Sequence, residues 1–265
     1  MIGAVPGWVR PLAVLFVIAI AIFMLAPLVV VVASSVSASE FLVFPPRGLS
    51  GRWYAEVLQS DAYLSAAWTS LLLALMTVAL SLSLGTAAAL ALARFRIPGR
   101  AFISSLFLSP LILPSLIFAI GLLMVFSIYG NGPSLFGLVI GHTVITLPYV
   151  IRTVTASLAD MDPHLDEAAR MMGARWWQRY FLVILPQCRT GMAAGAFFAF
   201  NISFDDAVVA LFMRAPDVET LPMRIYSTLE FSPDPSVAAV STIMIAMTAV
   251  LVLLLDRIFG LSKIM

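Results

Sequence analysis

Long, uninterrupted stretches of apolar residues alternate along the chain with short polar segments. An α-helix needs roughly 20 apolar residues to cross about 30 Å of hydrocarbon. The stretches show no alternation of apolar and polar positions, so the pattern predicts membrane-spanning helices rather than strands. Six segments are long enough, at about residues 11–33, 65–92, 102–127, 135–157, 190–213 and 236–258. The sequence therefore predicts an all-α, polytopic membrane protein, with residues 1–265 forming a single transmembrane domain.

The first apolar stretch has two interpretations. It follows a short N-terminus with Arg10, and Val36-Ser37-Ala38 resembles a cleavage site, as in a signal peptide. However, the run from Pro11 to Val32 is longer than the roughly 7–15 residues of a signal-peptide core. We therefore expect an uncleaved first span.

Composition excludes several classes of protein. The chain is 62% hydrophobic and 11% charged, whereas a soluble domain carries about a quarter charged residues. A water-soluble enzyme, a nucleic-acid binder and a disordered protein are all excluded, and a net charge of +1 creates no field that attracts nucleic acid. One cysteine and two histidines exclude a disulfide framework and a metal site built from His and Cys alone.

The basic residues predict an orientation in the membrane. Eleven of the fifteen Lys and Arg residues lie in the N-terminus, the loops 93–101 and 152–189, and the C-terminus. Basic residues concentrate on the cytoplasmic side, so we expect both termini to be cytoplasmic. Prolines inside the spans favour either simple kinks or broken helices beside a pathway, and the sequence leaves both open. They are Pro27, Pro110, Pro114 and Pro148.

The loop between the fourth and fifth spans contains a short helix with explicit ends. Asp162 is suited to cap its N-terminus, Pro163 suits its first position, and Gly173 can end it. An apolar stripe at i, i+3, i+4 and i+7 is too small to stabilise such a helix alone. The stripe consists of Leu165, Ala168, Ala169 and Met172. It predicts docking on the protein's own loops, on the membrane surface or on a partner protein, and the central alanines favour a groove in a partner.

The same loop resembles a known family motif. Glu167-Ala168-Ala169, then Gly173, then Val183-Ile184-Leu185-Pro186 matches the EAA loop of type I ABC importer permeases, with Val183 in place of isoleucine. The resemblance implies six transmembrane helices and, within loop 160–186, a cytoplasmic coupling helix that docks in a groove of an ATPase subunit. The residues it assigns to ATPase coupling are Asp166, Glu167, Ala168, Ala169, Met172 and Gly173.

Two adjacent carboxylates, Asp205 and Asp206, lie inside the fifth apolar stretch. Each costs about 2.5–3.5 kcal/mol at the centre of a membrane, so such residues usually face a cavity or a partner. In a continuous helix Asn201 and Asp205 share a face and Asp206 points about 100° away. The pair is predicted to line a pathway or, alternatively, to form ion pairs with Arg214, Arg224 or an arginine of a partner subunit.

Ser203–Val209 and Leu221–Ser227 closely resemble the C-type permeases of spermidine/putrescine importers. The resemblance implies a polyamine or related cation as cargo, because carboxylates and aromatic rings bind ammonium groups. The implied pathway residues are Asn201, Phe204, Asp205, Asp206 and Tyr226. The implied partners are two copies of an ATPase subunit, a second homologous permease, a periplasmic substrate-binding protein and the lipid of a bacterial inner membrane.

The remaining candidates are weaker. His142 fits a hydrogen-bonded packing residue better than a proton relay, and Cys188 fits a small packing residue. The chain has no phosphate-binding loop, so ATP and Mg²⁺ are expected on the partner ATPases, with no cofactor, metal or catalytic residue here. Three alternatives stay open: the same importer class with an opine, amino-acid derivative, phosphonate or iron chelate as cargo; an ion-coupled secondary transporter; and, least favoured, an intramembrane enzyme.

Overall fold

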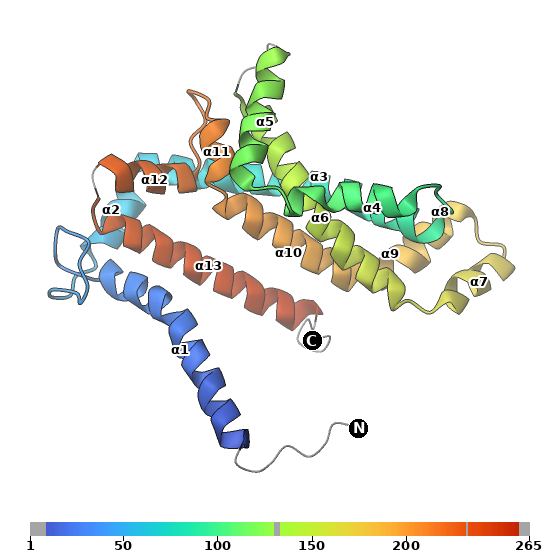
Figure 1. Cartoon of the computed structure of the whole chain (residues 1–265), viewed down its shortest axis with the longest axis horizontal. Coiled ribbons are helices and arrows are strands. Elements are labelled where there is room, and N and C mark those ends of the chain that lie inside the picture. The colour runs from blue at the N-terminus through green and yellow to red at the C-terminus, as the bar shows by residue number, and fades with distance from the viewer. Residues whose placement is uncertain (1–8, 130–132, 232, 260–265) are drawn as a thin grey trace. The chain divides into compact units, whose positions relative to one another are not determined.

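The computed structural model describes residues 9–129, 133–231 and 233–259, and in these residues the regular structure is helical (Figure 1). The chain divides into two compact units: residues up to 61 with 227–247, and residues 62–226 with those from 248 onward. Four described helices are long and apolar enough to cross a membrane, and six if each of two bent helix pairs counts as one span. The all-α membrane architecture expected from the sequence is confirmed.

The first unit contains the N-terminal span and the segment that follows it. Helix α1 (Val9–Ser35) exposes its apolar side chains along its length, as a lipid-facing helix does. The segment up to α2 (Arg52–Gln59) is folded back on the end of α1. There Trp53 Nε1 donates to the Ser37 carbonyl at 3.0 Å, and the Ser35 and Tyr54 hydroxyls are 2.7 Å apart. Residues 34–60 therefore form a specific structure rather than a loose connection.

The second unit contains most of the remaining helices. They are α3 (Asp61–Arg94), α4 (Arg100–Leu108), η1 (Ser109–Leu111), α5 (Ser115–Ile128), α6 (Leu135–Ala159), α7 (Pro163–Met171), α8 (Trp176–Gln178), the π-helical segment η2 (Arg179–Ile184), α9 (Leu185–Gln187), α10 (Arg189–Asp205) and α11 (Val208–Phe212). Helices α12 (Leu221–Phe231) and α13 (Ser236–Phe259) have residues in both units, as does α3 through its first residue, Asp61.

Helix α10 lies alongside α6 and packs extensively against it (Figure 1). Two glycines of α10 allow the close approach. A Cβ atom at Gly191 would lie 2.5 Å from the Thr153 carbonyl oxygen, and one at Gly195 would lie 2.7 Å from Thr153 Oγ1. Glycines four residues apart are typical of tightly packed membrane helices.

Two predicted spans are not single helices. For the stretch 102–127 the sequence left open whether its prolines kink or break the helix, and in the structure α4 and η1 meet α5 at 101° after a break that contains Pro114. Proline removes a backbone donor and disfavours helix in the residue before it, which explains the break. The expectation of one helix over 190–213 was wrong, because α10 ends at Asp205 and α11 starts at Val208. In addition, the segment 176–187 that precedes α10 is bent from α10 by 69°.

Candidate functional site

Helix α7 has the ends that its sequence predicts. The Asp162 side chain accepts a hydrogen bond from the His164 amide at 2.9 Å, which caps the N-terminus. At the other end Gly173 has φ +79°, in the left-handed region. The Gly173 amide donates to the Arg170 carbonyl and the Ala174 amide to the Ala169 carbonyl, both at 3.0 Å. This pair of bonds is the Schellman arrangement that satisfies the last carbonyls of a helix.

Most of α7 is open to its surroundings. Leu165, Glu167 and Ala168 are exposed, Ala169 is half-buried, and Met172 is 87% exposed. Glu167 lies 3.5 Å from the exposed His164 ring on the same helix. An apolar stripe that the described residues leave exposed is available to another surface. These residues and Gly173 therefore remain together on a short, accessible helix.

Asp166 is the exception on α7, because only 8% of it is exposed. Its two oxygens accept hydrogen bonds from Arg179 of η2, from Nε at 2.7 Å and from a terminal nitrogen at 2.6 Å. Arg94, the last residue of α3, lies 3.4 Å from one of the same oxygens. The Arg179 guanidinium holds the pKa of the Asp166 carboxyl below its ordinary value of 3.8. Asp166 is therefore turned inward, away from the exposed face of the helix.

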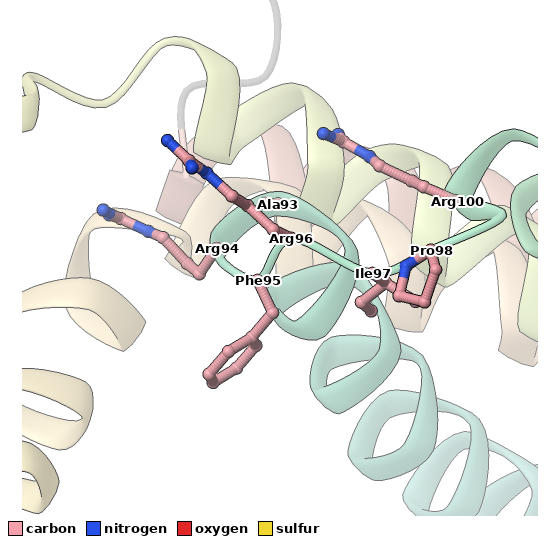
Figure 2. Close-up of a pocket in the computed structure, with 7 residues that line it drawn as sticks. All are labelled: Ala93, Arg94, Phe95, Arg96, Ile97, Pro98 and Arg100. Atoms are coloured by element: carbon pink, nitrogen blue, oxygen red, sulfur yellow. The ribbon is translucent and has the colours of Figure 1, made fainter.

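A basic pocket of about 440 Å³ lies at the turn between α3 and α4. Figure 2 shows the guanidinium groups of Arg94, Arg96 and Arg100 extending to the same side, whereas the Phe95 ring points the opposite way. The complete lining is Ala93, Arg94, Phe95, Arg96, Ile97, Pro98 and Arg100. Through the bond between Arg94 and Asp166, this basic loop and α7 lie at the same end of the second unit.

The acidic pair lies at the break between α10 and α11. Asp205 is the last residue of α10 and is exposed, whereas Asp206 has extended backbone, with φ −71° and ψ 118°. The expectation that Asp206 continues the helix, 100° around from Asp205, was therefore wrong. Asp206 Oδ2 accepts hydrogen bonds from the amides of Val209 at 2.8 Å and Ala210 at 3.3 Å. It thus caps the start of α11, which would otherwise leave these donors unpaired.

A buried polar cluster lies behind the break. The His142 side chain of α6 is fully buried, and its Nδ1 is 2.9 Å from the Ser203 hydroxyl of α10. Ser203 in turn donates to Thr77 of α3 at 3.3 Å. The other ring nitrogen of His142 lies 3.7 Å from Asp206 Oδ2. His142 therefore ties three helices to the acidic break, which confirms the prediction of a hydrogen-bonded packing residue.

The other residues predicted for the pathway have different surroundings. Asn201 is half-buried and its Oδ1 accepts from the Thr248 hydroxyl at 3.4 Å. Phe204 is only 7% exposed and stacks on Phe200, with ring centroids 5.5 Å apart. Tyr226 is 50% exposed. Within the described residues, no hydrogen bond, ion pair or ring contact joins Tyr226 to Asp205 or Asp206.

The arginines proposed as partners of the acidic pair lie elsewhere. Arg224 is 3.6 Å from Glu219 and its guanidinium lies 5.6 Å from the centre of the Tyr63 ring. Arg214 is exposed. In the part of the chain that the structure describes, neither arginine forms an ion pair with Asp205 or Asp206. Cys188 is fully buried in the apolar core, in agreement with the expected packing role.

Comparison with known proteins identifies the family. Residues 81–263 match the family described as the inner membrane component of binding-protein-dependent transport systems. The spermidine/putrescine transport system permease protein PotC of Escherichia coli K12 is 31% identical over 238 residues, which cover 90% of each chain. The putrescine transport system permease protein PotI of the same strain is 29% identical, covering 84% of this chain and 82% of PotI.

The fold also matches a solved transporter. A chain from the crystal structure of a bacterial ABC transporter that imports the acidic polysaccharide alginate aligns with a TM-score of 0.71, at 18% identity, over 97% of this chain and 99% of that chain. The family match covers more than half of the sequence, and the PotC similarity extends over nearly all of it. The chain belongs to the family of inner membrane components of binding-protein-dependent transport systems, the ABC importer permeases, and is a transport subunit rather than an enzyme.

Proposed function

We propose that this chain is one permease subunit of an ATP-driven importer for polyamines, such as spermidine and putrescine, and forms half of the translocation pathway. The observation that carries the proposal is the exposed carboxylate of Asp205 at a helix break, in a chain similar to permeases of spermidine/putrescine and putrescine transport systems. A second permease of the same family, two ATPase subunits that hold ATP and Mg²⁺, and a periplasmic binding protein complete the importer.

The two aspartates have different roles in this proposal. Asp206 already accepts two backbone hydrogen bonds and caps α11, so its carboxylate is committed to structure. Asp205 is exposed, and among the described residues it has no hydrogen bond or ion pair through its side chain. A carboxylate that is accessible at membrane depth and has no basic residue paired with it is suited to bind a protonated amine. Asp205 is therefore the residue that contacts the cation.

The aromatic residues divide in the same way. Phe204 is buried against Phe200, so it supports the shape of α10 rather than contacting a solute. Tyr226 is half exposed and retains an accessible ring face, which suits a cation–π contact with an ammonium group. Asn201, one helical turn before Asp205, offers a neutral polar contact on the same helix.

The exposed face of α7 is the contact with the ATPase in this proposal. Ala168 and Ala169 permit close approach, Glu167 supplies a charge for basic groups, and Met172 adds apolar area. Gly173 allows the sharp turn into α8. The basic loop at Arg94, Arg96 and Arg100 lies at the same end as α7, so both face the cytoplasm, as do the two termini.

The test is uptake of radiolabelled spermidine and putrescine by cells that lack this chain and carry a plasmid copy of it. We expect uptake to need the chain, and Asp205→Asn to lower uptake about tenfold or more while the complex still assembles. Asp217→Asn, which removes an exposed carboxylate beyond α11, is the matched control and should behave as the parent. Normal polyamine uptake without the chain would reject the proposed cargo.

Asp206→Ala separates the two roles, because it removes the cap of α11 but not the exposed charge of Asp205. It should lower the thermal stability of the purified importer more than Asp205→Asn does. If Asp205→Asn transports normally and Asp206→Ala loses transport without losing stability, the assignment of the two aspartates is reversed.

A further inference from the structure

The burial of Asp166 distinguishes it from the rest of the exposed helix α7. Its neighbours Leu165 and Glu167 are exposed, yet Asp166 is 8% exposed and faces two arginines. A residue that lies against the body of its own chain is not available to a docked ATPase subunit. The residue type also matters, because a carboxylate has two oxygens and can hold two partners at once.

The contacts of Asp166 join three elements that are distant in sequence. Arg179 of η2 binds both carboxylate oxygens, and this two-point geometry fixes orientation as well as distance. Arg94 binds from the end of α3 at 3.4 Å, and a terminal nitrogen of Arg94 also lies 3.7 Å from the Met161 sulfur, just before α7. The group Asp166, Arg179 and Arg94 is here called the α7 clamp.

The α7 clamp matters because α7 is short. A nine-residue helix is marginal by itself, and its two ends connect to the chain through turns at residues 160–162 and 172–175. A displacement applied to its exposed face could be absorbed in those turns. The clamp therefore links a displacement of α7 to η2 and to the end of α3, and η2 is followed by α9 and, after the 69° bend, by α10.

Helix α10 ends at Asp205, so the clamp connects α7 to the helix that carries the acidic break. We propose that Asp166 is a positioning residue that fastens α7 to η2 and α3, so that movement of the ATPase is passed to α10, and that it does not contact the ATPase itself. This inference rests on the proposed function only in taking the chain as an ATP-driven permease.

The test uses the complete importer in lipid nanodiscs, with ATP hydrolysis and solute transport measured on the same preparation. We expect Asp166→Asn to retain the ATPase subunits during purification and to keep basal hydrolysis, but to lower the solute moved per ATP about tenfold. Arg179→Lys should give a smaller loss, because lysine keeps the charge without the two-point geometry. Asp160→Asn, the same change at an exposed carboxylate before α7, is the matched control.

The double variant of Asp166→Asn and Arg179→Gln gives the decisive comparison. If both residues act through the clamp, the double variant loses no more coupling than either single variant. Losses that multiply, or ATPase subunits that no longer purify with Asp166→Asn, would place Asp166 in the ATPase contact and overturn the proposal. Unchanged coupling in both single variants would overturn it as well.

Amide hydrogen exchange provides a readout that needs no solute. In Asp166→Asn, amides of α7 from Ala168 to Met172 should exchange about tenfold faster than in the parent, whereas those in the middle of α6 should not change. If the parent importer moves no polyamine but α7 responds in this way, the cargo is wrong and the clamp stands. If polyamine is moved and α7 exchange does not respond, the clamp is wrong and the cargo stands.

Discussion

The His142 ring of α6 lies 3.7 Å from the Asp206 carboxylate, at the point where α10 gives way to α11. The other ring nitrogen is held by Ser203, which is itself bonded to Thr77. Asp206 therefore lies against the His142 ring of α6, which Ser203 holds in place. The position of α11 depends on this arrangement as well as on the Asp206 cap.

His142→Ala should destabilise the protein, because it leaves the Ser203 hydroxyl without its ring partner and opens a cavity at a fully buried position. A loss of about 1–3 kcal/mol is expected from the lost hydrogen bond and the new cavity together. Thermal unfolding in detergent measures it. His164→Ala, at an exposed ring on α7, should leave the unfolding temperature nearly unchanged, and equal shifts for the two histidines would contradict the buried role of His142.

Gly191→Ala should weaken the contact between α6 and α10. The new Cβ atom would lie 2.5 Å from the Thr153 carbonyl oxygen, so the helices must separate, at a cost of about 1–3 kcal/mol. Gly121→Ala is the matched control, because nothing lies within 4 Å of its Cβ position and alanine favours a helix by up to about 1 kcal/mol. The two variants should shift the unfolding temperature in opposite directions, and a shift in the same direction would reject the tight crossing.

The α7 clamp should not respond to pH in the ordinary range. The Asp166 pKa is lowered below 3.8, so the stabilisation from its charge is complete above that value and is lost only as the pH falls through the lower, folded-state pKa. Exchange of α7 amides, corrected for intrinsic rates, should therefore be constant between about pH 5 and 8. The measurement is made with the His164→Gln variant, so that titration of the imidazole on α7 does not contribute to the result. A transition inside this range would show that Asp166 is not held as a carboxylate.

Orientation can be tested by cysteine labelling in intact cells. Glu40→Cys, in the folded segment after α1, should react with a membrane-impermeant maleimide added outside the inner membrane. Arg96→Cys, in the basic loop, should react only after permeabilisation, because basic loops face the cytoplasm. The native Cys188 is fully buried and gives no background. The reverse pattern would place α7 on the outer side and reject the coupling role.

The sequence was most informative where local chemistry decides the structure. The ends of α7 follow from Asp162 and Gly173, whose preferences act within a few residues. The long helices α1, α3, α6 and α13 follow from apolar composition over about 20 residues. In each case the deciding interactions lie within one segment, so a single sequence is sufficient.

Tertiary partners could not be predicted in the same way. Asp166 was assigned to the ATPase contact by the resemblance of its loop to the EAA motif, whereas its partners in the structure lie 13 and 72 residues away in the sequence. Asp206 was placed in a helix because the apolar run continues past it, although an aspartate side chain can cap a new helix and so end the old one. The fold of residues 34–60 also depends on a hydrogen bond between residues distant in sequence, Trp53 and Ser37, and no sequence motif indicates this contact.

The end of α10 at Asp205 has an electrostatic consequence beyond its side chains. The last turn of a helix leaves carbonyl oxygens without helical partners, and the aligned peptide dipoles give this end a partial negative charge of about half an electron. In α10 that end coincides with the exposed carboxylate. The backbone itself therefore contributes attraction for a cation at this position, and it continues to do so when both aspartates are replaced by asparagine.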